Sequence, residues 1–348
     1  MQRRSIALAA LALALAPAVH AQAGPAAGFP NKPVRLVVTY PPGGTVDAVA
    51  RILGPRLAQI WGQSVVIDNR AGGGGIIGAQ AVLSAPADGY TLMVDASNHA
   101  QNPALKKRMP FDTLKDFAPV SLMIKVPSVL VVNPNFPVRS PRELIAHVKA
   151  NPGKVDYASS GNGSAQHLAA ELFALKTGAR MTHVAYRGGG PAMVDVMAGT
   201  VPVFFASLAS ALPYIQSGKL IAVAVAGQRR TPVLPDTPTF TEAGVGGVDV
   251  YEGNALFAPA GTPAALVDKI SKDVAAALSD REVKARLISL GAEVMGSTPR
   301  ELDQFRRAEI AQWGAVVRRG NATNALNPRQ AALPPGRAPP GAQREPSQ

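Results

Sequence analysis

Residues 34–51 of the chain are VRLVVTYPPGGTVDAVAR, and the interpretation of the whole sequence starts from this stretch. The β-branched and apolar run from Val34 to Tyr40 predicts a buried strand. The turn residues 41–44, PPGG, end it, and Thr45 is expected to cap a helix with Asp47 in its first turn. A helix N-terminus has unpaired backbone N–H groups and about half a positive charge from the helix dipole. The stretch therefore predicts an anion-binding turn, although an ordinary strand-to-helix connection has the same pattern.

A second loop of the same kind lies far down the chain, at residues 159–164 (SSGNGS). It follows a predicted strand at 155–159 and precedes a predicted helix at 164–177, which Ser164 is expected to cap. Its serines and asparagine offer neutral hydrogen-bonding groups, and its glycines allow a ligand to approach the backbone. Two such loops favour a ligand site over two solvated turns.

Strands and helices alternate along most of the chain, which predicts an α/β fold of mostly parallel sheets with helices on both faces. A change of pattern after residue 103 indicates two α/β units. We expect a first lobe at 29–121, a second lobe at 122–247, and a return to the first lobe at 248–320 with C-terminal helices. Two crossings between lobes favour a hinge and a ligand cleft.

The composition limits the classes of function. The 348 residues are 47% hydrophobic and 17% charged, which is typical of a compact globular protein. The absence of cysteine excludes disulfides and thiol catalysis. The formal net charge is +12, but the basic residues are scattered and aromatic residues make up only 5%. We therefore expect attraction for anionic solutes and no nucleic-acid partner.

Both ends of the chain have distinctive compositions. Residues 1–23 have the pattern of a signal peptide: Arg3 and Arg4 precede an apolar segment at 6–18, and small residues follow. The apolar segment is shorter than the roughly 20 residues that a membrane span needs. These features predict export to the periplasm. Residues 321–348 contain six prolines without an apolar period and are expected to be disordered.

Several other motifs in the sequence are less specific. Gly73, Gly75 and Gly78 satisfy GxGxxG, but on the second strand-helix turn, where a dinucleotide fingerprint is not expected. Arg187, which precedes three glycines, is either a donor to a carboxylate or a surface residue. The histidines form no metal-binding pattern and no GxSxG motif is present. We expect neither a catalytic constellation nor a metal or other cofactor.

A series of ordered motifs from about residue 29 to residue 320 resembles the Bug family, the extracytoplasmic receptors of tripartite tricarboxylate transporters. The motifs include YPPGGTVD at 40–47, NRAGGGG at 69–75, ADGYTL at 87–92, SGNGS at 160–164 and FAPAGTP at 257–263.

This resemblance implies a two-lobed periplasmic-binding-protein fold. A small organic carboxylate, a di- or tricarboxylate or an aromatic acid, would bind in the cleft, held largely by backbone groups of the loops at 40–47 and 159–165. It also implies docking to membrane permease subunits, and we expect a monomer. The candidate ligand-binding residues are Tyr40, Gly43, Gly44, Thr45, Asp47, Ala71, Gly75, Ser97, Ser160, Asn162, Gly163, Ser164, Ala165, Arg187 and Ser207.

One segment departs from the family pattern. The family often has Phe-Asp-Asn-Leu-Pro-Ser where residues 205–210 are FASLAS, so the acid is replaced by Ala206 and its neighbour is Ser207. Loss of that acid argues against amino-bearing ligands. Two alternatives to a transport receptor remain: an exported enzyme, either a hydrolase using Ser97 or Ser164 or an oxidoreductase using the loop at 73–78, and a receptor that signals instead of feeding transport.

Overall fold

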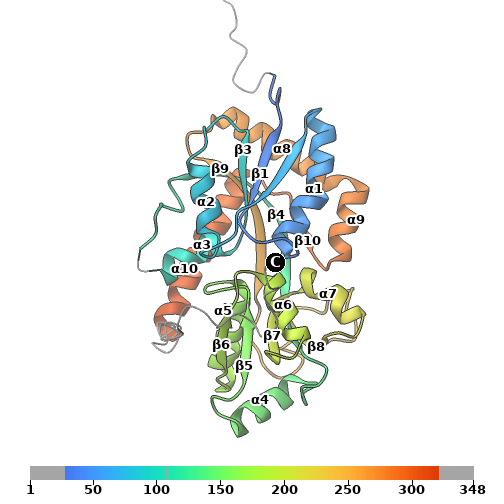
Figure 1. Ribbon diagram of the computed structural model, residues 1–348. Coiled ribbons are helices and arrows are strands. Elements are labelled where there is room, and N and C mark those ends of the chain that lie inside the picture. The colour runs from blue at the N-terminus through green and yellow to red at the C-terminus, as the bar shows by residue number, and fades with distance from the viewer. Residues whose placement is uncertain (1–27, 107, 321–348) are drawn as a thin grey trace, which may run out of the picture.

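The chain folds into two lobes that share two long strands (Figure 1). This computed structural model describes residues 28–106 and 108–320, so the predicted signal peptide and Pro-rich tail lie outside the described residues. No helix in the described part is long and apolar enough for a membrane span.

The strands of the first lobe are ordered β2-β1-β3-β9-β4, with β10 also paired to β4. Those of the second lobe are ordered β4-β7-β5-β6, with β8 paired to β4. Their bounds are β1 Val34–Val38, β2 Val65–Asn69, β3 Thr91–Ala96, β4 Phe117–Val132, β5 Asp156–Ser159, β6 Thr182–Ala185, β7 Val203–Ser207, β8 Ile221–Ala226, β9 Tyr251–Pro259 and β10 Glu293–Val294.

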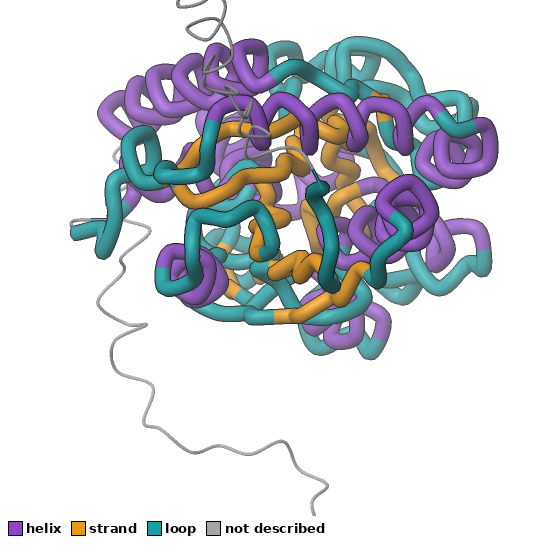
Figure 2. Tube along the Cα trace, turned by 90° about the horizontal axis from the view of Figure 1, so that it is seen from above, coloured by secondary structure: helices purple, strands orange, loops and turns teal. Residues whose placement is uncertain are grey.

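Helices surround the strands, as the view from above shows (Figure 2). The first lobe carries α1 Thr45–Trp61, α2 Ile76–Leu83, α3 Asn98–Leu105, α8 Ala264–Ser279, α9 Arg281–Ser289 and α10 Pro299–Gly320. The second lobe carries α4 Pro141–Ala150, α5 Ala165–Thr177, α6 Gly189–Met197 and α7 Leu208–Gln216. Helix α10 also reaches the second lobe, where Trp313 is buried in the core with Leu130 and Phe173.

The predicted α/β fold with two lobes is confirmed, but its sheets are more mixed than predicted. The outer pairs β1–β2, β1–β3, β5–β6 and β5–β7 are parallel. The central strands β4 and β9 are antiparallel to each other and to their other neighbours. The antiparallel pairs lie where the chain passes between the lobes, and the βαβ units flank them.

Strand β4 crosses from one lobe to the other at Pro127. Residues 117–127 pair with β9, and residues 128–132 pair with β7 and β8. The structure has one continuous strand through this crossing. Pro127 cannot donate a backbone hydrogen bond, and it lies where β4 changes partner. The chain returns at residues 250–251, because Val250 is still bonded to Ala226 before β9 begins. The residue limits predicted for the lobes stay a prediction.

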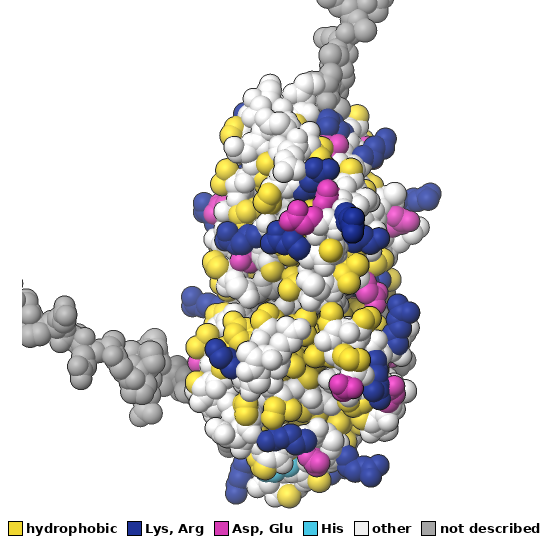
Figure 3. Space-filling view, turned by 90° about the vertical axis from the view of Figure 1, so that its right-hand side faces the viewer, with side chains coloured by type: hydrophobic (Ala, Val, Ile, Leu, Met, Phe, Trp, Pro, Cys, Tyr) yellow, Lys and Arg dark blue, Asp and Glu magenta, His cyan; other side chains and the backbone are white. Residues whose placement is uncertain are grey.

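The lobes are packed against each other in this structure. One buried apolar cluster combines Val46 and Ile52 of α1 with Leu208 and Leu212 of α7. Figure 3 shows that Lys and Arg side chains are dispersed over the face in view, as the scattered basic residues in the sequence predicted. The structure therefore shows the two lobes closed over the region between them.

Candidate functional site

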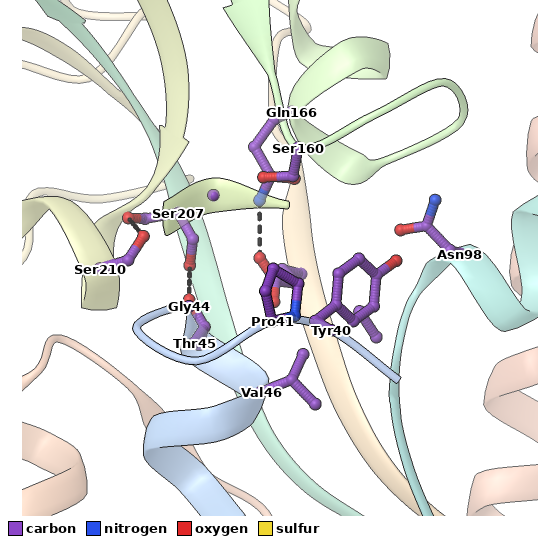
Figure 4. A pocket seen from close by; sticks show the side chains of 13 residues that line it. Tyr40, Pro41, Gly44, Thr45, Val46, Asn98, Ser160, Gln166, Ser207 and Ser210 are labelled. Carbon is purple, nitrogen blue, oxygen red and sulfur yellow. Dashed lines mark hydrogen bonds between the residues drawn. The ribbon is translucent and has the colours of Figure 1, made fainter. Parts of the chain in front are cut away.

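A cavity of about 20 Å³ lies between the lobes, with space for about one water molecule (Figure 4). First-lobe and second-lobe residues line it, together with a residue of the shared strand β9. The lining residues are Tyr40, Pro41, Gly44, Thr45, Val46, Ala96, Asn98, Ser160, Gln166, Gly189, Ser207, Ser210 and Glu252.

Five helices begin at the wall of this cavity. Thr45, Asn98 and Gly189 are the first residues of α1, α3 and α6, Gln166 is the second residue of α5, and Ser207 directly precedes α7. A helix N-terminus presents unpaired N–H groups and the positive end of the helix dipole. Their convergence gives the cavity a field that favours an anion without any lysine or arginine in the lining.

The loop before α1 differs from the prediction in the role of Thr45. Gly44 is the N-cap, without a side-chain capping bond, and Thr45 lies in the first helical position. The Thr45 hydroxyl instead donates to the Ser207 hydroxyl of the other lobe at 2.8 Å. Thr45 therefore joins the lobes across the cavity and does not cap the helix.

Asp47 supports this loop from behind and is not among the cavity-lining residues. Its carboxylate accepts hydrogen bonds from Gly43 N at 3.1 Å and Asn69 Nδ2 at 3.0 Å, and it pairs with Arg51 at 2.9 Å. Burial acts to raise the pKa of Asp47, but these hydrogen bonds, with that from Arg51 foremost, lower it overall. Asp47 thus stays ionised and fixes Gly43.

The second-lobe loop is held by its own side chains. Ser164 caps α5 as predicted and accepts from His167 N at 3.1 Å. The Nδ1 atom of His167 accepts from Gly163 N at 3.1 Å, and Ser159 Oγ accepts from Gly161 N at 3.1 Å. The N–H groups of both glycines are therefore used inside the loop, which keeps it in shape beside the cavity.

A pair of stacked histidines lies behind this loop. The rings of His167 and His183 are 4.2 Å apart and nearly parallel, and Ser159 Oγ lies 2.6 Å from His183 Nε2. Burial lowers the pKa of His167 to about 4. Burial and the neighbouring His167 lower that of His183 to about 2. Both rings are thus neutral at ordinary pH, and His167 keeps the lone pair that binds Gly163.

The structure reveals a buried acid that the sequence analysis missed. Glu252 is 6% exposed and lines the cavity from the start of β9. It accepts hydrogen bonds from Gln166 Nε2 at 2.6 Å and Asn254 Nδ2 at 3.0 Å. Burial raises the pKa of Glu252, and its hydrogen bonds offset only part of this effect. The sequence signal was a short polar interruption, YEGN at 251–254, in an otherwise apolar strand.

A larger hollow of about 180 Å³ adjoins the cavity, since Tyr40 and Ser160 line both. It is lined by Tyr40, Gly72, Gly73, Gly74, Gly75, Lys106, Ser160, Gly161, Asn162, Ala185, Tyr186 and Arg187. Lys106 and Arg187 give it two positive charges, in contrast to the cavity.

The structure brings together many of the candidate ligand-binding residues, though not all of them. Five line the cavity: Tyr40, Gly44, Thr45, Ser160 and Ser207. Gly75, Asn162 and Arg187 line the hollow. Gly43, Asp47, Ala71, Ser97, Gly163, Ser164 and Ala165 are in neither lining. The polar cavity-lining residues that the sequence analysis missed are Asn98, Gln166, Ser210 and Glu252, which lie at helix starts or on a strand outside the glycine loops. Pro41, Val46, Ala96 and Gly189 complete the lining.

The residues considered for enzyme alternatives have other contacts. Ser97 Oγ accepts from Gly253 N at 2.8 Å, and Ser164 caps α5. Asp95, the acid following the GxGxxG loop, is buried and accepts from Thr39 Oγ1 at 2.6 Å. Within residues 28–106 and 108–320, no group of His, Asp and Glu side chains is arranged to hold a metal ion. These contacts give no support to either enzyme alternative.

Comparisons with known proteins agree with this geometry. Residues 49–322 match the family model described as "Tripartite tricarboxylate transporter family receptor". The protein BugT of Bordetella pertussis is 37% identical over 292 residues, which cover 83% of this chain and 90% of BugT. The structure of Rpa4515 from R. palustris with adipate has a TM-score of 0.82 and 36% identity, covering 84% of this chain and 98% of that one. The structure of MatC from Rhodopseudomonas palustris with bound malate has a TM-score of 0.80 and 34% identity, covering 83% of this chain and 100% of MatC.

Proposed function

The chain belongs to the family of tripartite tricarboxylate transporter receptors, as its motifs predicted, and from this premise we propose that it captures a small organic carboxylate between its lobes. One observation carries the proposal: five helix N-termini converge on one cavity between the lobes. Such a site attracts a negative group through backbone N–H groups and helix dipoles.

We expect the preferred ligand to carry two carboxylates. One carboxylate would bind beside Thr45 and Ser160 in the cavity, which a slight opening of the lobes would enlarge beyond its present volume of about 20 Å³. The other would extend past Tyr40 into the hollow that contains Lys106 and Arg187. The two related structures with adipate and malate, both dicarboxylates, support this assignment. The identity of the ligand depends on which spacing of carboxylates fits the two compartments.

Binding would proceed by closure of the lobes around the ligand. Strands β4 and β9 form a two-strand connection in which small changes at Pro127 and Val250 can change the angle between the lobes. A hydrogen bond to a charged group contributes about 1.5–3 kcal/mol. Four or five such bonds, less the cost of ordering, approach the roughly 8 kcal/mol of a micromolar complex. A ligand that bonds to both lobes therefore favours the closed state.

Delivery to membrane permease subunits completes the proposed role. The N-terminal signal-peptide pattern and the family support a periplasmic location. A strain that lacks the gene should lose uptake of the radiolabelled ligand. Retained uptake with loss of ligand-dependent gene expression would instead indicate the signalling alternative.

A thermal-shift screen of purified protein against organic acids tests the ligand class. Gly44 has a negative φ, and a Cβ atom added there would have only Pro41 O within 4 Å, at 3.9 Å, so Gly44→Leu is expected to fold and to obstruct the cavity. Gly246→Leu, at an exposed position with no neighbour within 4 Å, is the control. We expect a dicarboxylate to stabilise the wild type and Gly246→Leu but not Gly44→Leu. If all three proteins were folded and no organic acid stabilised any of them, the proposal would be contradicted.

A further inference from the structure

Glu252 is an unexpected residue for a site that attracts carboxylates. It lines the cavity at the junction of the lobes, where Val126 of β4 is its register partner in the neighbouring strand. The hydroxyl pair of the lobe junction lies beside it in the lining, because Thr45 Oγ1 donates to Ser207 Oγ, and Ser207 acts to lower the pKa of Glu252. Two neutral donors, Gln166 Nε2 and Asn254 Nδ2, contact its carboxyl group. Glu252 is therefore fixed in the cavity wall, where an incoming anion would approach it.

The groups packed around Glu252 supply no compensating positive charge. Tyr40 of the first lobe lines the same cavity, and burial together with Asp95 and Glu252 holds the pKa of Tyr40 well above its usual value. On α5, Gln166 is uncharged and the neighbouring His167 is kept neutral by burial. On β4, Lys125 lies over the ring of Phe305. No ion pair is formed by Glu252 with any described residue.

Two ionised carboxylates in one buried cavity repel each other strongly, and the usual outcome is that they share one proton. The five helix N-termini can stabilise one negative charge, but a second would lie in the same desolvated space without a cation. The ligand must therefore bring a compensating positive group, or a proton must be taken from solvent.

We propose that Glu252 is protonated in the ligand-bound state, so that its carboxylic acid donates a hydrogen bond to the ligand carboxylate. This inference rests on the proposed carboxylate site. One proton passes from solvent to a carboxylate oxygen of Glu252 when the ligand binds to receptor in which Glu252 is ionised, and it returns to solvent on release. Glu252 then acts as a specificity residue that couples carboxylate capture to pH.

The direction of the pH effect follows from linkage. The bound ligand raises the affinity of Glu252 for a proton, so binding is strongest below the pKa of Glu252 in the free receptor. The affinity for the ligand decreases as pH rises above that value, by at most about tenfold for each pH unit. A zwitterionic ligand would behave differently, because its ammonium group could pair with an ionised Glu252 and no proton would be needed.

Isothermal titration calorimetry of the full protein with malate and adipate, from pH 5 to 9 and in buffers of different ionisation enthalpy, tests the inference. Glu252→Gln keeps the size of the side chain and removes its charge. Glu282→Gln, at an exposed residue of α9 outside both linings, is the control. Thermal unfolding of each variant checks that it is folded. Aspartate serves as the zwitterionic counterpart of malate.

We expect the wild type and Glu282→Gln to take up close to one proton on the alkaline side of the range and to lose affinity as pH rises. Glu252→Gln should take up none and keep its affinity at pH 9. Binding without proton uptake and with constant affinity in the wild type would overturn the proposed coupling of carboxylate capture to pH but leave the proposed function intact. Tighter binding of aspartate than of malate, lost in Glu252→Gln, would also overturn it. Failure of the folded wild type and Glu252→Gln to bind any of these acids would overturn both proposals.

Discussion

The hydroxyl of Thr45 in the first lobe donates a 2.8 Å hydrogen bond to the hydroxyl of Ser207 in the second. Both side chains are buried, at 5% and 3% exposure, and both line the cavity. The bond forms between the starts of α1 and α7, so it is present only when these two helix N-termini lie close together. It therefore links closure of the lobes to the assembly of the anion-binding cavity.

Replacing Thr45 with valine should weaken ligand binding. Valine has the same shape but no hydroxyl, so the bond to Ser207 is lost at a net cost of about 0.5–1.5 kcal/mol. We expect a dissociation constant roughly 2- to 10-fold higher by calorimetry. Thr45→Ser, which keeps the hydroxyl, is the control and should bind nearly as the wild type does. Equal affinity of all three proteins would show that the bond does not contribute to closure.

Gly190 provides a test of closure that is separate from folding. It lies in α6, where alanine is intrinsically better than glycine by up to about 1 kcal/mol, and a Cβ atom there would lie 3.1 Å from Pro42 O of the other lobe. Gly190→Ala should therefore retain or raise the free energy of unfolding and yet bind ligand several-fold more weakly. Urea unfolding and calorimetry on the same sample measure both. A variant that binds as tightly as the wild type would mean that this contact does not limit closure.

Arg187 should discriminate between ligands with one and two carboxylates. It is exposed at the hollow, where a second carboxylate would approach it. We expect Arg187→Gln to weaken adipate binding several-fold and to leave hexanoate binding unchanged. Arg187→Lys keeps the charge and serves as the control. Added salt should reduce the adipate preference, because exposed charges are screened. If Arg187→Gln weakened the binding of adipate and hexanoate equally, Arg187 would not be the partner of the second carboxylate.

The stability of the protein should fall in acid because of the buried histidines. The pKa of His167 is about 4 in the folded state and about 6.5 in an unfolded chain. The unfolded state therefore binds more protons, and this stabilisation is present above pH 6.5 and is lost as pH falls to about 4. The expected loss is on the order of 3 kcal/mol.

The matched variant is His167→Asn, whose amide oxygen can occupy a position similar to that of Nδ1 and accept from Gly163 N. Urea unfolding at pH 7 and pH 4.5 should show that the free energy of unfolding falls less in acid for this variant than for the wild type. If the free energy of unfolding fell equally in acid for both proteins, the decrease would be due to groups other than His167.

The parts of the fold that the sequence predicted well are those set by local chemistry. Ser164 caps α5, because a serine hydroxyl placed before a helix accepts the free N–H groups of its first turn. The two glycine loops were also located from local sequence, without reference to distant contacts. Helix α3 was missed because its sequence, NHAQNPAL, has weak helix propensity. Its polar residues Gln101 and Asn102 are buried, which indicates that tertiary packing determines this helix.

The candidate site was only partly predictable, because a cavity between lobes depends on contacts between distant residues. Thr45 has the residue type of a helix cap, yet its partner is 162 positions away. Asp47 has the residue type of a ligand contact, but Arg51 and Asn69 direct it to the back of its loop. Glu252 lies outside every glycine motif, and only the crossing of β9 between the lobes brings it to the cavity.

A crystal structure of the protein with malate or adipate bound tests the central claim most directly. We predict one carboxylate within about 3 Å of backbone N–H groups at the start of α1 and of hydrogen-bonding groups of the loop at 159–165, so that both lobes contact it. A ligand that contacts one lobe only, or that binds outside the region between Thr45 and Ser160, would contradict the account.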